Sequence, residues 1–172
     1  YHKKAKQDGY RSRAVYKLQE LQKRFQLFRR GNRVLDLGAA PGGWLQAAHE
    51  FVGKRGRLVG VDLLPIDPLP IAQVTILEGD IMDEEIREQA ITCLGGPAHV
   101  VLSDMAPNIT GVRITDCARS YELSCCALDT AVACLRKDGH FIVKIFPGDD
   151  FEAFLKQCKE HFRKVRTTKP DA

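Results

Sequence analysis

Two lysines and an aspartate stand where this sequence could arrange acid–base chemistry. Lys144 interrupts the apolar run His140–Phe146, and a strand covered on both faces would make an unpaired charge there costly. Asp104 follows the apolar run Ala98–Ser103, and Lys17 lies in a basic segment near the start of the chain. A lysine whose pKa is lowered by burial and by a second cation can accept a proton. The alternatives are a structural salt bridge from Lys144 to Asp104 and a solvated helix lysine at position 17.

A second candidate site is the segment Val34–Trp44, which passes from an apolar run into small residues and then into an amphipathic pattern. This order predicts a strand, a tight turn and a helix. Gly38, Gly42 and Gly43 leave the turn almost without side chains, so a ligand can lie against its backbone. The start of the helix adds free N–H groups that point at such a ligand. The turn therefore indicates a nucleotide-type cofactor.

Glycine spacing and two aspartates narrow the choice of cofactor. The turn does not match the G-x-G-x-x-G of dinucleotide folds, and the sequence has no phosphate-binding G-x-x-x-x-G-K-[ST] loop. Asp62 ends the second expected strand, where a carboxylate can accept from ribose hydroxyls, and Asp80 follows the third, placed to accept from an adenine amino group. Two carboxylates without a nearby cation favour S-adenosylmethionine, which has no phosphates and a positive sulfonium. A nicotinamide dinucleotide, no cofactor at all, and turn or cap chemistry for the aspartates remain alternatives.

Alternating strand and helix patterns would position these residues. Strands are predicted at 33–37, 58–63, 74–77, 98–103 and 140–146, and helices at 9–28, 44–52, 84–94, 121–135 and 149–161. Ser12 could cap the first helix, and a further strand could start at Val165. The alternation predicts a single α/β domain over residues 1–172, with a doubly wound, mostly parallel sheet and helices on both faces. Ligands of such sheets bind beyond the carboxyl ends of the strands, where Gly38–Trp44, Asp62, Asp80, Asp104 and Lys144 stand.

Positive charge is concentrated at the start of the chain. Residues 1–33 carry eleven lysines and arginines against two acids, although the net charge of the whole sequence is only +4. Charge segregated to this degree indicates a surface that faces a polyanion. We therefore expect residues 1 to about 30 to form a basic helical extension that contacts nucleic acid. A solvated helix face is the alternative.

Composition bears on compartment and partners. No apolar run approaches the roughly 20 residues that cross a bilayer, and the charged opening stretch does not resemble a signal peptide. The six cysteines show neither a C-x-x-C pair nor zinc-ligand spacing, which favours reduced thiols. We expect a cytoplasmic protein that is a monomer and uses neither a membrane nor a metal.

Four segments, in order over nearly the whole chain, resemble the FtsJ (RrmJ) family of S-adenosylmethionine-dependent RNA ribose 2′-O-methyltransferases. They are Tyr10–Leu18, Val34–Trp44, Leu102–Asn108 and Val143–Phe146. The resemblance implies a Rossmann-like methyltransferase fold, an RNA partner, and methyl transfer to a uridine ribose of 23S ribosomal RNA in the large subunit. Other members act on tRNA or on mitochondrial ribosomal RNA. A non-catalytic RNA-binding module with a vestigial cofactor loop is the alternative from another class.

The resemblance also implies roles for individual residues. Lys17, Asp104 and Lys144 match the first three members of a catalytic Lys-Asp-Lys-Glu tetrad, with Lys144 as the acceptor of the 2′-hydroxyl proton. Contacts to S-adenosylmethionine, and to its product S-adenosylhomocysteine, fall on Gly42, Trp44, Asp62, Asp80 and Asp104. The family's glutamate lies on a later strand, beyond Thr168–Ala172. We therefore expect the fourth member and the last strands outside the given sequence.

Overall fold

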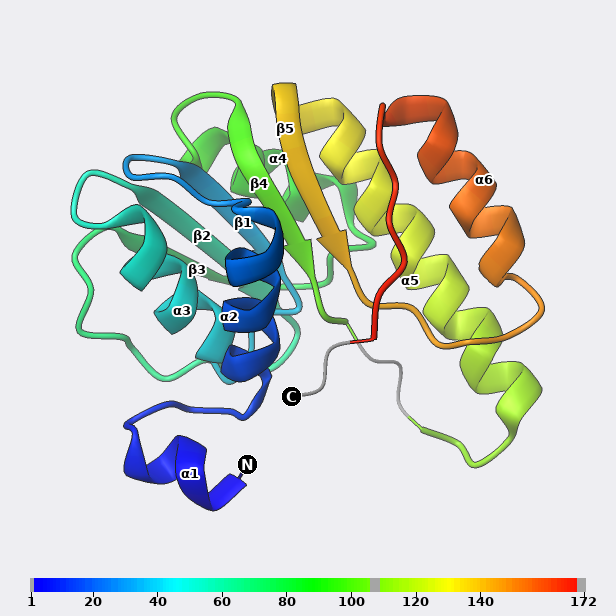
Figure 1. Cartoon of the computed structure of the whole chain (residues 1–172), viewed down its shortest axis with the longest axis horizontal. Coiled ribbons are helices and arrows are strands. Elements are labelled where there is room, and N and C mark those ends of the chain that lie inside the picture. The colour runs from blue at the N-terminus through cyan, green and yellow to red at the C-terminus, as the bar shows by residue number, and fades with distance from the viewer. Residues whose placement is uncertain (1, 106–108, 170–172) are drawn as a thin grey trace.

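The computed structural model describes residues 2–105 and 109–169, whose strands form one five-stranded sheet (Figure 1). The strands are β1 (Arg33–Leu37), β2 (Arg57–Asp62), β3 (Val74–Glu78), β4 (Ala98–Ser103) and β5 (Leu135–Val143). Every neighbouring pair is parallel, and the order is β3-β2-β1-β4-β5. The predicted doubly wound parallel sheet is confirmed, and its strand order reverses between β1 and β4, the place where such sheets bind ligands.

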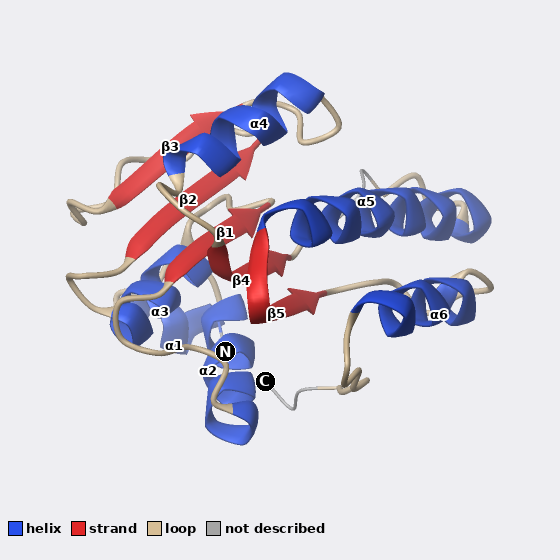
Figure 2. Cartoon of the chain, turned by 90° about the horizontal axis from the view of Figure 1, so that it is seen from above, coloured by secondary structure: helices blue, strands red, loops and turns tan. Residues whose placement is uncertain are grey.

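Helices cover both faces of this sheet. They are α1 (His2–Gln7), α2 (Ala14–Phe25), α3 (Gly43–Val52), α4 (Glu84–Cys93), α5 (Arg113–Cys134) and α6 (Phe151–His161). Helices α2 and α3 lie on one face and α4 and α5 on the other, while α6 packs against α5 (Figure 2). Within the two described ranges, no helix is both long and apolar enough to cross a membrane.

The hydrophobic core consists of one apolar cluster on each face of the sheet. Val34 of β1 packs with Val15 and Leu18 of α2 in the cluster under α2 and α3. Leu35 and Leu37 point the other way and join the cluster under α4 and α5. A strand that is covered on both faces needs apolar side chains at successive positions, which explains the composition of β1 apart from its aspartate.

The first predicted helix has different ends in the structure. The single helix predicted over residues 9–28 is wrong, because α1 ends at Gln7, Gly9 has a φ of 82°, and α2 runs only from Ala14 to Phe25. Ser12 does not cap α2, since Arg13 is the N-cap residue and makes no side-chain cap bond. Ser12 instead packs against the glycine turn, where a side chain on Gly43 would meet its Oγ at 2.5 Å. The break in the helix therefore brings residues 9–13 to the turn.

Helix α5 starts earlier than predicted. It begins at Arg113, whereas the sequence predicted a start at Tyr121. The Asp116 carboxylate accepts from the amide of Thr110 at 3.0 Å and from its hydroxyl at 2.7 Å, and these bonds organise the turn before the helix. The apolar periodicity used for the prediction is weak at this end, because the first turn exposes Ile114 to solvent.

The last predicted strands also differ. Strand β5 ends at Val143 rather than at Phe146, because the amide of Phe146 donates to the Ser120 hydroxyl of α5 at 3.1 Å and leaves the sheet. The described residues 162–169 contain no strand, so the strand expected from Val165 is wrong. Residues 106–108 of the β4 exit loop and 170–172 lie outside the described residues.

Packing of α2 into the core can be tested at Leu18, which is fully buried. We expect Leu18→Ala to lower the free energy of unfolding by about 2–5 kcal/mol, because it leaves a cavity between α2 and α3. Urea denaturation would measure the loss. The exposed Lys23 on the same helix is the control, and Lys23→Ala should stay within about 0.5 kcal/mol of the unaltered protein. Equal stabilities for the two variants would contradict the place of α2 in the core.

Candidate functional site

The carboxyl ends of the strands meet in one row. Parallel pairing sets Leu37 beside Val61 on one side and beside Ser103 on the other, and sets Ser103 beside Val143. The next residue along each of these four strands is Gly38, Asp62, Asp104 or Lys144. Backbone bonds extend the ladder by one step, because the Asp104 amide donates to the Leu37 carbonyl and the Lys144 amide to the Ser103 carbonyl. The register therefore brings these predicted site residues to one edge.

Asp104 is in contact with one lysine and is influenced by the charge of a second. Its Oδ1 is 3.5 Å from Nζ of Lys144. Burial raises the pKa of the Asp104 carboxyl above its ordinary value, and the charges of Lys144 and of Lys17, on α2, offset only part of that rise. Lys144 and Asp104 are thus in contact, and Lys17 is near enough for its charge to act on the same carboxylate.

Lys144 is less buried than predicted. Its side chain is 48% exposed, because β5 is the last strand in the described sheet and ends one residue before it. The prediction that Lys144 lies inside a strand covered on both faces is therefore wrong. Its place is set by the strand end and by the Asp104 carboxylate rather than by an apolar environment.

The glycine turn closes around a small cavity beside Asp104. Gly38 and Gly42 have φ values of 78° and 115°, in the left-handed region that disfavours side chains. Residues of the turn, Ser12, Trp44 and Asp104 line a cavity of about 20 Å³. The space next to Gly38 is taken by the Met105 side chain, whose Cγ would lie 2.5 Å from an added Cβ. The absence of a side chain at Gly38 thus lets Met105 lie directly against the backbone of the turn.

Arg11 holds the outer side of the turn. Its Nη1 donates to the carbonyls of Pro41 at 3.1 Å and Asp67 at 2.5 Å, and its Nη2 donates to the carbonyl of Pro68 at 2.8 Å. The guanidinium lies against Gly42, at the place where a larger residue would carry a side chain. This arginine therefore joins the glycine turn to the β2–β3 connection and is not part of a solvated basic face.

Trp44 ties the start of α3 to the start of α2. Its indole Nε1 donates to the carbonyl of Ala14 at 2.8 Å, and the residue is 7% exposed. Gly42 precedes it as the N-cap residue of α3. Both predicted cofactor contacts therefore also shape the turn that borders the cavity.

The aspartates after β2 and β3 stabilise turns. Asp62 accepts from the amides of Ala40 at 2.8 Å and Leu64 at 2.9 Å, and Asp80 accepts from the amide of Met82 at 2.9 Å. Both aspartates therefore stabilise turns, which is the alternative to cofactor binding that the sequence left open. A carboxylate has about four lone-pair sites, so these bonds leave capacity for a ligand. Asp62 is bonded to the glycine turn, whereas Asp80 is exposed farther along the edge.

Asp36 is a site residue that the sequence analysis did not single out. It is 1% exposed, and neither carboxylate oxygen has a hydrogen-bond partner among the residues that the structure describes. It lines the cavity from the centre of β1, in register between Gly60 and Leu102. In the sequence, Asp36 is an acidic residue inside an apolar strand, just as Lys144 is a basic residue inside an apolar run. Such a charged residue indicates a candidate site residue.

Buried carboxylates dominate the electrostatics of the cavity. Burial raises the pKa of Asp36 well above its ordinary value, and the nearby charges of Asp104 and Asp62 raise it further. Oδ1 of Asp104 accepts no hydrogen bond within the described residues, although it is in ion-pair contact with Lys144. Buried acceptors are normally satisfied, so unsatisfied ones indicate a ligand that donates N–H or O–H groups. A cationic ligand would also relieve the repulsion between the carboxylates, and S-adenosylmethionine, with its sulfonium and ammonium groups, fits both requirements.

Comparison with solved structures identifies the fold. A chain from Plasmodium falciparum assigned as a ribosomal RNA methyltransferase matches with a TM-score of 0.80 and 29% identity, covering 94% of this chain and 92% of that one. Fibrillarin from Aeropyrum pernix, solved with S-adenosyl-L-methionine, matches with a TM-score of 0.59 and 17% identity, covering 88% and 65% of the two chains. The parallel sheet with its glycine turn at the strand ends is a Rossmann-like methyltransferase fold.

Comparison with sequences identifies the family. Ribosomal RNA large subunit methyltransferase E of Syntrophobacter fumaroxidans is 48% identical over 172 residues, covering this whole chain and 87% of that protein. The protein of the same name from Methanothrix thermoacetophila is 49% identical over 172 residues, which cover 66% of its length. The profile of the FtsJ-like methyltransferase family matches residues 10–172. This chain belongs to the FtsJ-like methyltransferase family.

The buried charge of Asp36 makes a testable contribution to stability. Because its pKa is raised on folding, the folded state holds the proton more tightly than the unfolded state does. Stability is therefore lost as the pH rises from the ordinary carboxyl pKa of about 3.9 through the higher folded value. We expect Asp36→Asn to increase the free energy of unfolding near neutral pH by roughly 1–3 kcal/mol without cofactor, and the gain to shrink toward acid pH.

Urea denaturation across a pH series would measure this difference. The exposed Asp129 of α5 provides the matched control, since Asp129→Asn removes the same charge without a buried carboxylate. A gain for Asp36→Asn that does not change with pH would contradict an ionisable buried carboxyl.

Proposed function

We propose that this protein transfers a methyl group from S-adenosylmethionine to the 2′-hydroxyl of a uridine ribose in 23S ribosomal RNA of the large subunit, acting as a monomer in the cytoplasm. The observation that carries this proposal is the contact of Lys144 with Asp104 beside the glycine turn, with Lys17 near the same carboxylate. Family membership supports methyl transfer, and the relatives named as ribosomal RNA large subunit methyltransferases support the RNA class.

S-adenosylmethionine, when bound, supplies an electrophilic methyl group. The residues proposed to hold it are Gly42, Trp44, Asp62, Asp80 and Asp104. Asp62 has remaining lone pairs for ribose hydroxyls, and Asp80 for an adenine amino group. To these we add Asp36, which borders the cavity, whose oxygens have no partner within the described ranges, and which can accept from N–H donors. Met105 lies over Gly38, so ligand entry would require this side chain to move.

The proposed reaction depends on position and on one proton transfer. Lys144, as the neutral amine, would accept the proton of the 2′-hydroxyl as the methyl group passes to the ribose oxygen and S-adenosylhomocysteine is left. Asp104 contacts Nζ of Lys144 and thereby holds the amine at the strand end. The charge of Lys17, on α2, acts on the same carboxylate, so a second lysine would stand near the reacting ribose. Alignment of the two reactants is a large part of the rate enhancement in such a displacement.

The basic N-terminal region is proposed to bind RNA phosphates. The exposed basic residues among the first 33 are Lys3, Lys4, Lys6, Arg13, Lys23, Arg24, Arg29 and Arg30. In Figure 1 the arrows of β4 and β5 point to the same lower edge at which α1 lies. The cations of α1 would hold an RNA backbone at this edge, with an affinity that falls as salt rises.

The proton-acceptor role can be tested at Lys144. We expect Lys144→Ala to lower kcat for methyl transfer by at least about 100-fold, because general-base catalysis is lost. Tritiated methyl transfer to undermethylated large ribosomal subunits would measure it, and calorimetry should show unchanged affinity for S-adenosylmethionine. The exposed Lys137 lies near the other end of β5, and Lys137→Ala is the control that should keep full activity. Full methyl transfer by Lys144→Ala would exclude the assignment.

The RNA-binding role can be tested with a set of four substitutions, which replaces Lys3, Lys6, Arg13 and Lys23 by Gln. We expect weaker RNA binding and a log–log salt slope reduced by about 3, since each lost phosphate contact removes roughly 0.7–0.9 from it. Arg11 is kept, because it joins two loops. Fluorescence anisotropy at several salt concentrations would measure the slope.

A control with the same change in net charge separates local contact from general attraction. It replaces the exposed Lys54, Arg55, Lys137 and Lys159 by Gln. If both sets of substitutions reduced the slope equally, RNA binding would depend on overall charge rather than on the N-terminal region.

A further inference from the structure

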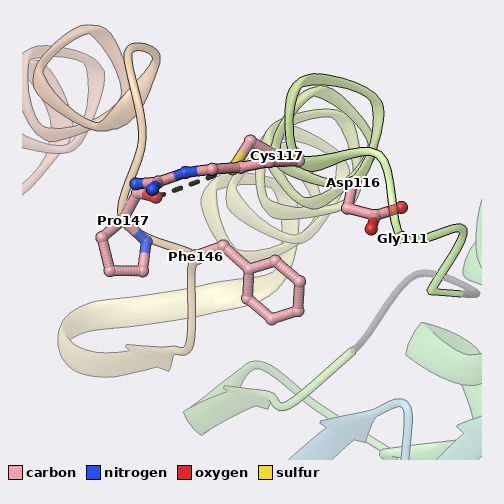
Figure 3. Close-up of a pocket in the computed structure, with 6 residues that line it drawn as sticks. Gly111, Asp116, Cys117, Phe146 and Pro147 are labelled. Atoms are coloured by element: carbon pink, nitrogen blue, oxygen red, sulfur yellow. Dashed lines mark hydrogen bonds between the residues drawn. The ribbon is translucent and has the colours of Figure 1, made fainter.

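A second hollow lies beside Lys144, and the roles described above do not use it. It has a volume of about 400 Å³ and is lined by Gly111, Arg113, Asp116, Cys117, Phe146 and Pro147 (Figure 3). These residues come from two segments, the start of α5 with the turn before it and the loop after β5. Clefts of about 300–1,000 Å³ are typical of ligand sites.

The hollow adjoins the proposed reacting centre. Phe146 follows Lys144 by two residues, so their Cα atoms are at most about 7 Å apart. In a nucleotide the base is attached to C1′, which is bonded directly to the carbon that carries the 2′-hydroxyl. A ribose placed at Lys144 can therefore put its base within the reach of Phe146.

One wall of the hollow is held to α5 by hydrogen bonds. The amide of Phe146 donates to the Ser120 hydroxyl at 3.1 Å, and the Cys117 thiol donates to the Pro147 carbonyl at 3.6 Å, a contact drawn as a dashed line in Figure 3. Ser120 is 1% exposed, so the first of these bonds is shielded from water. The aromatic ring is therefore supported by a loop that is already fixed to its neighbouring helix.

The opposite wall is also fixed. Asp116, 7% exposed, accepts from both the amide and the hydroxyl of Thr110. These hydrogen bonds lower the pKa of Asp116, so its carboxylate stays ionised at neutral pH and keeps the turn in place. Arg113, in the first turn of the same helix, is exposed and supplies a cation to the lining. The hollow thus combines an aromatic ring with a guanidinium on a preformed frame.

This combination fits a nucleobase. An unpaired base offers a flat apolar face to stack on an aromatic ring and a polar edge to accept hydrogen bonds. The segment around the hollow also exposes Ile109, Val112 and Ile114, which are apolar side chains of the kind that base faces can cover. The proposed substrate, RNA, carries such a base on every nucleotide. The lining of the hollow therefore suits a part of the proposed substrate.

We propose that this hollow binds the base of the nucleotide whose ribose is methylated, with Phe146 stacking on the base and Arg113 donating to one of its carbonyl oxygens. The inference rests on the proposed function, since it names a substrate subsite for the same reaction. It makes Phe146 a positioning residue, which holds the ribose at Lys144 through the attached base.

The test compares Phe146→Leu with Phe146→Trp. The leucine variant keeps an apolar side chain but has no aromatic face, and we expect it to raise KM for RNA by about tenfold. The tryptophan variant should restore KM to near that of the unaltered protein, and both should bind S-adenosylmethionine with unchanged affinity by calorimetry. Phe162 stacks on Phe141 away from the hollow, so Phe162→Leu controls for the loss of a ring. An unchanged KM for Phe146→Leu, or an equal rise for Phe162→Leu, would overturn the proposal.

Arg113 is tested in the same way against an exposed arginine farther along α5. Arg113→Gln should raise KM for RNA severalfold, whereas Arg119→Gln should not. Equal effects of the two substitutions would contradict a specific donor at position 113.

An RNA fragment with an abasic target nucleotide makes the assignment specific. The unaltered protein should lose about tenfold in kcat/KM on this substrate, and Phe146→Leu should lose no further activity, because the stacking partner is already absent. Additive losses would overturn the subsite. A loss of activity for Phe146→Leu on assembled subunits but not on the RNA fragment would also overturn the subsite, because it would indicate a contact with a ribosomal protein. Absence of methyl transfer by the unaltered protein would instead refute the proposed function.

Discussion

The alignment of the strand ends is the constraint on which the candidate site depends. Gly38, Asp62, Asp104 and Lys144 are far apart in the sequence, and they meet because the strands before them pair in parallel at a fixed register. A slip of one residue would exchange the two faces of a strand and move its terminal residue out of the row. Each of the two core clusters is filled by particular side chains of these strands, so such a slip would also disrupt core packing. Core packing and site geometry are therefore set by the same pattern.

The carboxylates of the cavity lower the stability of the fold and favour the binding of a cationic ligand. Among the residues that the structure describes, neither oxygen of Asp36 has a hydrogen-bond partner, and Asp104 and Asp62 add negative charge around it. A protein selected only for stability would place an apolar residue at that position in β1. Carboxylates that are fixed before a cationic ligand arrives need no reorganisation when it binds, which is the electrostatic advantage of a preorganised site.

The sequence predicts the sheet well, because buried parallel strands leave short apolar runs between turn residues. The limits of the helices were harder to predict, since they depend on contacts between distant residues, as with Ser12 against Gly43. The site was likewise predictable only in part. The residue types and spacing predict that Asp104 and Lys144 lie at one edge of the sheet. A local pattern does not show that β5 is the edge strand of the described sheet and leaves Lys144 exposed. A charged residue inside an apolar run indicates a candidate site residue at Asp36 as well as at Lys144, and the structure buries Asp36.

Arg11 joins the segment before α2 to both loops around the glycine turn, and α2 itself contributes Val15 and Leu18 to the core. The basic N-terminal region is thus built into the body of the domain instead of being attached to it by a linker. Over evolutionary time, a region connected in this way cannot be gained, lost or exchanged as a module without unfolding part of the domain. Any change in what this face binds would instead arise from single substitutions at its exposed positions, with Arg11 and the buried residues held constant.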